Sequence, residues 1–469
     1  MSIFSLKYLG VFSIIISFLS IFNIIYSYYF NILDNLTNYI ITFVLSFFLG
    51  NVLIIIKKYK FLKVNLYERI LAVFIGYIFL PLIISIPYFL SSENLGFFNS
   101  YFESVSGFTS TGFTVFNNVN QIDQTLILWR SSSQWIGGLY FLFSILLLID
   151  IFDENLKKSL TNYISFNNSE IFKQIFKIIV IYIFLTFFIF VLLKLINLRS
   201  YDALNYSLTI ISSGGFLPNN NFDLIFSDDL SKIVLSVSML LSFFSLFFIY
   251  NLIFFKKKNI NYLSEDINIL IYLILIIITF FIFLNYDNNF LNILVSICSS
   301  VSNIGISFNQ IPNNLAFVFL ILVILGGSFF STSSGLRVIK VITLIKFSIN
   351  NILSHSKPNQ IYSNKLSLNK ISAKNTDINK YFLAIIIFLI SLFIITFLLT
   401  ISNIEFETSF KLGILTIMNT VNSEMYNLYG LNFYNFNLLS KISLIIFMII
   451  GRIELLSVII LIKKFLFKS

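Results

Sequence analysis

The sequence has few charged, cysteine and histidine residues for its length, and each scarcity excludes a class of protein. Only 11% of its 469 residues are charged, whereas a soluble domain usually carries about 25%. The single Cys298 has no partner for an internal disulfide, and the single His355 cannot build a histidine-based metal site or catalytic triad. These features exclude a cytosolic enzyme, a nucleic-acid-binding domain and a secreted disulfide-linked protein.

Apolar residues dominate the chain instead. Hydrophobic residues make up 57% of the sequence, and the mean hydropathy is +0.90, so its main solvent is lipid. A helix needs roughly 20 apolar residues to cross about 30 Å of hydrocarbon. Ten segments meet this requirement; the first is too long for a cleaved signal and lacks a small-residue cleavage site. They lie near residues 8–26, 39–56, 70–90, 126–151, 175–196, 232–255, 267–284, 315–345, 382–401 and 438–462.

The positive charges alternate between the two sides of these spans. Lysines and arginines gather in 57–69, 157–158, 256–258, 346–380 and 463–468, whereas the connections on the other side carry acids. The positive-inside rule therefore predicts that these basic segments and both termini are cytoplasmic, and we expect a multi-pass protein of the bacterial cytoplasmic (inner) membrane. The net charge of +10 is then a topology signal, which argues against nucleic-acid binding. The basic segment 346–380 could dock a regulator or contact anionic lipid headgroups.

Four connections on the outer side resemble one another. Each joins a short amphipathic segment to a turn of small or polar residues, which indicates a half-length helix that enters the bilayer and returns as extended chain. Non-helical backbone at that depth must be buried in protein or line a water-filled cavity. The segments are 97–114, 201–216, 290–308 and 406–430. We therefore expect an all-α membrane protein with about ten transmembrane helices: two leading spans, then four helix–re-entrant loop–helix repeats around one pore.

The predicted division of the chain follows these repeats. Two leading helices occupy 1–65, and a polar cytoplasmic linker separates the third repeat from the fourth. The repeats are 66–158, 159–258, 259–350 (with a broken gate helix) and 380–469, and the linker is 351–379.

Glycine is scarce, with 17 residues, so its placement in the re-entrant segments is informative. A permeating potassium ion must replace its water shell, and rings of backbone carbonyls can do so. Glycine adopts the required backbone angles without steric cost, and the C-terminal ends of short helices add partial negative charge. The alternative is that these glycines only permit tight loop turns.

Two further features lie inside the predicted spans. The run GGSFFSTSSGLRVIK at 326–340 interrupts the eighth span and predicts a broken helix that acts as a movable barrier; small residues at a helix-packing face are the alternative. Arg452 lies in the middle of the tenth span, where an arginine is costly and faces a partner or a wet cavity. We expect it to contact another element, and a purely structural ion pair is the alternative.

These motifs resemble the TrkH/KtrB family of potassium-uptake proteins. The matching runs follow the family order, and the two leading spans look more like TrkH than KtrB. The runs are SGFTSTGFT at 106–114, RSSSQWIGG at 130–138, SSGGF at 212–216, GGSFFSTSSGLRVIK at 326–340 and GRIELLSVIIL at 451–461. The resemblance implies four pseudo-equivalent pore repeats in one chain, a homodimer and a cytoplasmic nucleotide-binding regulatory subunit. It implies no cofactor, with potassium as the substrate held at the filter residues.

Carried over by position, the resemblance also assigns residues to a selectivity filter and to a gate. The filter residues would be Ser110, Thr111, Gly112, Ser212, Ser213, Gly214, Asn303, Ile304, Gly305, Asn422, Ser423, Glu424 and Met425. The gate residues would be Gly326, Gly327, Ser331, Thr332, Ser333, Ser334, Gly335, Arg337 and Arg452.

The fourth repeat departs from the family because its window, Asn422–Tyr426, contains no glycine. Either the side chain at the position where a glycine would be expected points away from the pore axis, or the filter loses one of its carbonyl positions. The Glu424 carboxylate could raise the local cation concentration at the pore mouth, or it could be a solvated acid of the outer loop.

The predicted function is potassium uptake through this filter and gate, without covalent chemistry. A sodium or mixed-cation transporter of the same fold is an alternative that the altered fourth repeat favours. A multi-spanning enzyme of lipid-linked sugars is a further alternative. The short, acidic, histidine-free outer loops argue against it.

Overall fold

The computed structural model describes most of the chain. The described residues are 3–55, 65–148, 171–220, 222–246, 248–249, 263–283, 290–308, 312–356, 375–428 and 430–453, together with 457, 460 and 463. The longer helices are α1 (Ile3–Tyr29), α2 (Leu36–Ile55), α3 (Leu66–Leu90), α5 (Gln124–Leu147), α7 (Ile171–Leu195), α10 (Asp229–Phe243), α12 (Leu263–Phe283), α15 (Val338–Ser356), α16 (Asn375–Ile401) and α18 (Leu438–Ile453).

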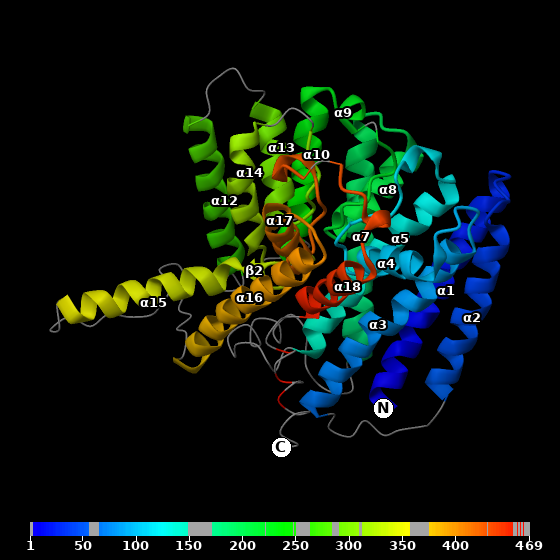
Figure 1. Ribbon diagram of the computed structural model, residues 1–469, viewed down its shortest axis with the longest axis horizontal. Coiled ribbons are helices and arrows are strands. Elements are labelled where there is room, and N and C mark those ends of the chain that lie inside the picture. The colour runs from blue at the N-terminus through cyan, green and yellow to red at the C-terminus, as the bar shows by residue number, and fades with distance from the viewer. Residues whose placement is uncertain are drawn as a thin grey trace.

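Shorter elements fill the spaces between these helices (Figure 1). The short α-helices are α4 (Gly96–Phe108), α8 (Ser200–Ile211), α9 (Phe222–Ile225), α13 (Phe290–Val301), α14 (Ala316–Ile324) and α17 (Phe406–Ile417). The 3-10 turns are η1 (Val119–Gln121), η4 (Asn313–Leu315), η5 (Glu424–Tyr426) and η6 (Phe433–Asn435), and the strands are β1 (Leu325–Gly326) and β2 (Leu336–Arg337).

Large apolar side chains on the outer surface identify a membrane protein. Among the described residues, five helices are long and apolar enough to cross a bilayer: α1, α2, α3, α7 and α16. Phe48, Phe187 and Phe393 on these helices are 65%, 61% and 74% exposed. A soluble protein rarely exposes large apolar patches. In a bilayer the same side chains face lipid tails that are equally apolar.

The short helices α4, α8, α13 and α17 pack inside the wall of longer helices. Each contacts the long helix that precedes it, in the pairs α3–α4, α7–α8, α12–α13 and α16–α17. Contacts also close a circuit between successive units, through α5–α8, α10–α13, α14–α17 and α18–α4. Contacts among the described helices therefore link the four short helices and their neighbours in a closed circuit.

Several predicted boundaries differ from the structure. Helix α15 continues to Ser356 and α16 begins at Asn375, so both helices extend into the predicted linker 351–379; residues 357–374 lie outside the described part of the chain. Helix α10 ends at Phe243, well before the predicted limit of the sixth span. The predicted repeat boundary at 158/159 and most of the basic segments, including 57–63, also lie outside the described residues.

Candidate ion pathway

The short helices α4, α8, α13 and α17 all end in the same backbone turn. Two positions after the last helical residue, the chain adopts a left-handed conformation, at Ser110 (φ 57°), Ser213 (φ 55°), Asn303 (φ 60°) and Asn419 (φ 49°). The next N–H then donates to a carbonyl five positions earlier, from Thr111 to Ser106 (2.9 Å), Gly214 to Thr209 (2.8 Å), Ile304 to Ser299 (3.0 Å) and Thr420 to Leu415 (2.9 Å). Left-handed caps of this kind satisfy carbonyls that a helix end leaves unpaired.

This shared turn defines an equivalent position in each repeat, two residues after the left-handed residue. The position is occupied by Gly112, Gly215, Gly305 and Val421. In the first and third repeats the triplets expected from the sequence, Ser110–Gly112 and Asn303–Gly305, have this register.

The register differs from the expectation in the other two repeats. In the second, Ser213–Gly215 is the equivalent triplet, one residue beyond the expected one, and Ser212 caps helix α8. In the fourth, α17 ends at Ile417 and the triplet is Asn419–Val421. The expected window 422–425 therefore follows this turn, and Met425 is buried with its Sδ 3.6 Å from Ser300 Oγ.

The four equivalent residues meet at one place. A Cβ atom built on Gly112 would lie 3.0 Å from Val421 Cβ and 3.2 Å from Gly215 Cα. A Cβ on Gly215 would lie 2.5 Å from Val421 Cβ and 2.7 Å from the Ile304 carbonyl oxygen. A Cβ on Gly305 would lie 2.5 Å from the Val421 carbonyl oxygen. A side chain at Gly215 or Gly305 would therefore overlap another repeat, and one at Gly112 would be in tight contact and strained by the φ of 84°.

Asparagine side chains join neighbouring repeats around this meeting point. Asn303 Nδ2 donates to the Val323 carbonyl at 2.9 Å and to Thr420 Oγ1 at 3.2 Å. Asn419 Nδ2 donates to Thr111 Oγ1 at 3.0 Å and to the Met448 carbonyl at 2.9 Å. Asparagine tolerates the left-handed backbone better than most residues, so these two residues both form the turn and fix the next repeat.

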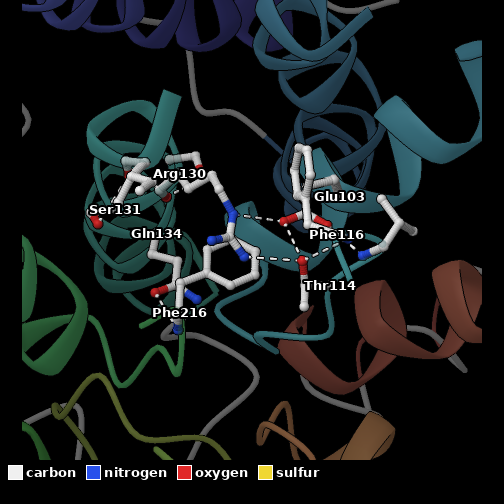
Figure 2. Close-up of polar contacts among 10 residues, drawn as sticks. Glu103, Thr114, Phe116, Arg130, Ser131, Gln134 and Phe216 are labelled. Atoms are coloured by element: carbon white, nitrogen blue, oxygen red, sulfur yellow. Dashed lines mark hydrogen bonds and ion pairs between the residues drawn. The ribbon is translucent and has the colours of Figure 1, made fainter. Parts of the chain in front are cut away.

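A buried ion pair between α4 and α5 stabilises the loop that contains Gly112 (Figure 2). Arg130 on α5 donates through Nε to Glu103 Oε1 on α4 at 2.9 Å, and both side chains are excluded from solvent, at 2% and 0% exposure. Glu103 also accepts from Thr114 Oγ1 at 3.1 Å and from the Val115 N–H at 2.9 Å. Thr114 and Val115 directly follow the Gly112 segment, so the carboxylate fixes the backbone of that loop.

Helix α5 also contacts the second loop. The Arg130 guanidinium lies over the Phe216 ring, 4.2 Å from its centroid (Figure 2). One helical turn later, Gln134 Oε1 accepts from the Phe216 N–H at 3.3 Å, and a Cβ on Gly214 would lie 2.2 Å from the same oxygen. Residues four apart share one face of a helix, so Arg130 and Gln134 together hold two neighbouring loops. Both residues lie in the motif at 130–138, but its sequence does not by itself predict a role for either.

The helix break predicted at 326–335 is present, between α14 and α15. Strands β1 and β2 pair in parallel, Leu325 with Leu336 and Gly326 with Arg337, so the segment 326–335 begins and ends at the same place. Arg337 Nη1 stabilises its interior by donating to the carbonyls of Ser328 (2.8 Å) and Ser333 (3.0 Å). We call residues 326–335 the gate segment, after the role that the sequence predicts for them.

The gate segment also explains the early end of α10. The Ser328 N–H donates to the Phe243 carbonyl at 3.0 Å, and the Leu246 N–H donates to the Phe330 carbonyl at 3.0 Å. These bonds occupy a backbone carbonyl and a backbone N–H of α10 and the residues after it, which would otherwise pair within a continuing helix.

The gate segment contacts two of the four loops directly and a third through Arg452. Thr332 Oγ1 donates to the Ile211 carbonyl at 2.7 Å and lies 3.2 Å from Ser213 Oγ. Ser334 Oγ lies 3.4 Å from Asn419 Oδ1. Through Arg452, Ser334 is also joined to the first loop.

Arg452 on α18 links the gate segment to the loops. Its guanidinium donates to Ser334 Oγ, to Ser110 Oγ at 3.3 Å and to the Ser212 carbonyl at 3.3 Å. It also lies 4.1 Å from the centroid of the Phe141 ring. Within the described residues its contacts are with hydroxyls, a carbonyl and a ring, and the contact with another element matches the sequence expectation.

Comparisons with known proteins place these features in a wider group, although no family model matches the chain. The chain is 26% identical to the Trk system potassium uptake protein TrkG of Escherichia coli, over 92% of each protein. It is 24% identical to an uncharacterized cation transporter of Methanocaldococcus jannaschii, over 87% of the chain and 84% of that protein. It is also 21% identical to TrkH of Escherichia coli, over 80% and 81%. This chain is a relative of the TrkG and TrkH proteins.

A solved structure shares the same fold. The potassium transporter TrkH from Vibrio parahaemolyticus superposes with a TM-score of 0.82 at 19% identity, covering 97% of this chain and 98% of that one. The fold of the chain is therefore that of TrkH, in agreement with the resemblance identified from the motifs.

Proposed function

We propose that this chain transports potassium ions into a bacterial cell across the cytoplasmic membrane. The observation that supports this most strongly is the meeting of four equivalent loops, three of which bring glycine backbone to one point. A cation that leaves water needs several oxygens arranged around it, and converging backbone carbonyls supply them. The relatives named as potassium uptake proteins support the same activity. The proposed activity is transport, not an enzymatic reaction.

The proposed ion pathway has two parts. The filter comprises Ser110–Gly112, Ser213–Gly215, Asn303–Gly305 and Asn419–Val421. The gate segment contacts these loops, and its displacement would open the path. Arg452 would stabilise the closed arrangement, since it binds both the gate segment and the filter. Glu424, in the segment that follows Val421, would attract cations to the mouth of the pathway.

The membrane orientation and the partners belong to the same proposal. The ends of α1 and α2 that adjoin the basic segments would face the cytoplasm. In Figure 1 the start of α1, the end of α2 and the start of α3 lie at one edge of the molecule, and α9 lies at the opposite edge. A homodimer and a cytoplasmic nucleotide-binding regulatory subunit are carried over from the family resemblance.

A sodium or mixed-cation transporter is the second candidate. Val421 occupies the position at which the other repeats have glycine. A filter with one unlike repeat offers an ion a less uniform set of oxygens, which favours weaker discrimination among cations.

Growth rescue distinguishes transport from other roles. The chain would be expressed, with its cognate regulatory subunit, in a bacterium that lacks its own potassium-uptake systems. We expect growth at low potassium with the native chain and none with Gly112→Asp. Gly430→Asp is the matched control, because Gly430 also has a positive φ (61°) but an added Cβ would meet no atom within 4 Å. Failure of the native chain, or rescue by Gly112→Asp, would contradict the proposal.

A further inference from the structure

The fourth repeat places a branched side chain where the other three have glycine. Val421 follows the left-handed residue Asn419 at the same distance as Gly112, Gly215 and Gly305 follow theirs. Because valine is branched at Cβ, a positive φ is a genuine outlier for it. Gly112 and Gly305 both have φ 84°, whereas neither Val421 nor Gly215 has a positive φ. The peptide group at Val421 therefore differs in conformation from those at Gly112 and Gly305.

The Val421 side chain reaches the equivalent residues of the other three repeats. Its Cβ would lie 3.0 Å from a Cβ on Gly112 and 2.5 Å from one on Gly215, and its Cγ1 2.9 Å from one on Gly305. A group that contacts all three equivalent positions lies where the four loops converge. The space that three glycines leave is thus filled by one isopropyl group.

An isopropyl group has no oxygen with which to replace the water around a cation. Hydrophobic constrictions close pores because water withdraws from them.

We propose that Val421 is the specificity-determining residue of this pathway, an apolar constriction that limits both the rate of ion passage and the preference for potassium. The inference rests on the proposed function, since it concerns the same filter. Val421 lies in the one repeat in which this chain lacks the filter glycine. The proposed constriction is therefore a property of this sequence.

A graded series of substitutions tests the constriction. Val421→Gly removes the side chain and permits the positive φ, Val421→Ala shortens it, and Val421→Ile retains a branched apolar group. Val44→Gly on α2 is the matched control, because Val44 faces outward and is 55% exposed. Uptake of rubidium and of sodium would be measured in the potassium-uptake-deficient bacterium, with the amount of each variant in the membrane determined by immunoblot.

We expect uptake to rise in the order Ile or Val, Ala, Gly. The ratio of rubidium to sodium uptake should rise about tenfold in Val421→Gly, the factor that one restored polar contact to an ion would give. An unchanged rate and ratio in Val421→Gly at normal membrane levels would overturn the inference while leaving the proposed function intact.

Ion-dependent thermal unfolding gives a readout that does not depend on flux. Ligands that bind only the folded state raise its stability, and the two tryptophans on α5, Trp129 and Trp135, report unfolding in detergent. We expect potassium chloride to raise the unfolding midpoint of Val421→Gly more than sodium chloride does, with a smaller difference for the native chain and Val421→Ile. If no variant transports ions but Val421→Gly gains this shift, the proposed function fails and the constriction stands. If the native chain shows the same shift as Val421→Gly, the constriction is refuted.

Discussion

Replacing Glu103 by glutamine should strongly destabilise the protein, because it leaves Arg130 charged and unpaired in the interior. The two side chains are 0% and 2% exposed, and the carboxylate accepts from Arg130, Thr114 and the Val115 N–H. Removing one partner of a buried ion pair costs about 3–5 kcal/mol. Glutamine has nearly the same size as glutamate, so lost packing contributes little to this estimate.

The free energy of unfolding in detergent measures this cost directly, by chemical denaturation followed through tryptophan fluorescence. Glu407→Gln is the matched control, because Glu407 pairs with Lys411 on the surface and its side chain is 70% exposed. Exposed pairs contribute about 0.2–1 kcal/mol. A double variant, Glu103→Gln with Arg130→Met, removes the buried charge as well and should recover part of the lost stability.

The same substitution should also reduce ion uptake, because Glu103 holds the backbone that follows Gly112. A loss of less than about 1 kcal/mol in Glu103→Gln, equal to that of Glu407→Gln, would refute the assignment of Glu103 as the buried anchor of the first loop.

Three further predictions concern single substitutions. Arg452→Ala should change the rate of rubidium uptake without changing the ratio of rubidium to sodium; a shifted ratio would count against a gating role. Glu424→Gln should lower uptake at low external cation concentration, and unchanged uptake and selectivity would show that its charge plays no part. Gly137→Ala should destabilise the fold by more than about 1 kcal/mol, because the new Cβ would lie 2.0 Å from the Phe108 carbonyl oxygen. Gly430→Ala should cost less, because its added Cβ meets no atom within 4 Å and only the positive φ of 61° is unfavourable; equal effects would contradict that account.

The sequence predicted the helices and the half-helices well, because their signals are local. Apolar length identifies a span, and amphipathic pieces followed by small residues mark the short helices α4, α8, α13 and α17. The break at 326–335 was also predictable, since a run of glycine and serine inside an apolar segment weakens a helix.

The register of the loops was harder to predict because it depends on where each half-helix ends. The sequence predicts the fourth filter segment at 422–425, where a glycine would be expected. In the structure the equivalent triplet begins at the left-handed residue Asn419. An asparagine shortly after the amphipathic run is the signal that could have located it, since Asn303 occupies the same position in the third repeat. In the second repeat two adjacent glycines, Gly214 and Gly215, make the sequence compatible with two registers of the filter segment that differ by one residue.

The sequence does not predict the side-chain contacts that stabilise the loops, because these contacts join residues far apart in the chain. Nothing local pairs Glu103 with Arg130, or Gln134 with Phe216. An acid and an arginine that both lie within apolar segments are nevertheless costly unless paired, so the pairing of Glu103 with Arg130 was open to inference.

Rubidium uptake by the native chain measures directly whether potassium-like ions pass through the four converging loops. The potassium-uptake-deficient bacterium would express the native chain, Gly112→Asp or Gly430→Asp at equal membrane levels, and initial rates of uptake would be measured with and without competing potassium. Our account predicts potassium-inhibited uptake by the native chain and Gly430→Asp, and none by Gly112→Asp. Equal uptake by Gly112→Asp and the native chain would contradict passage through the four converging loops.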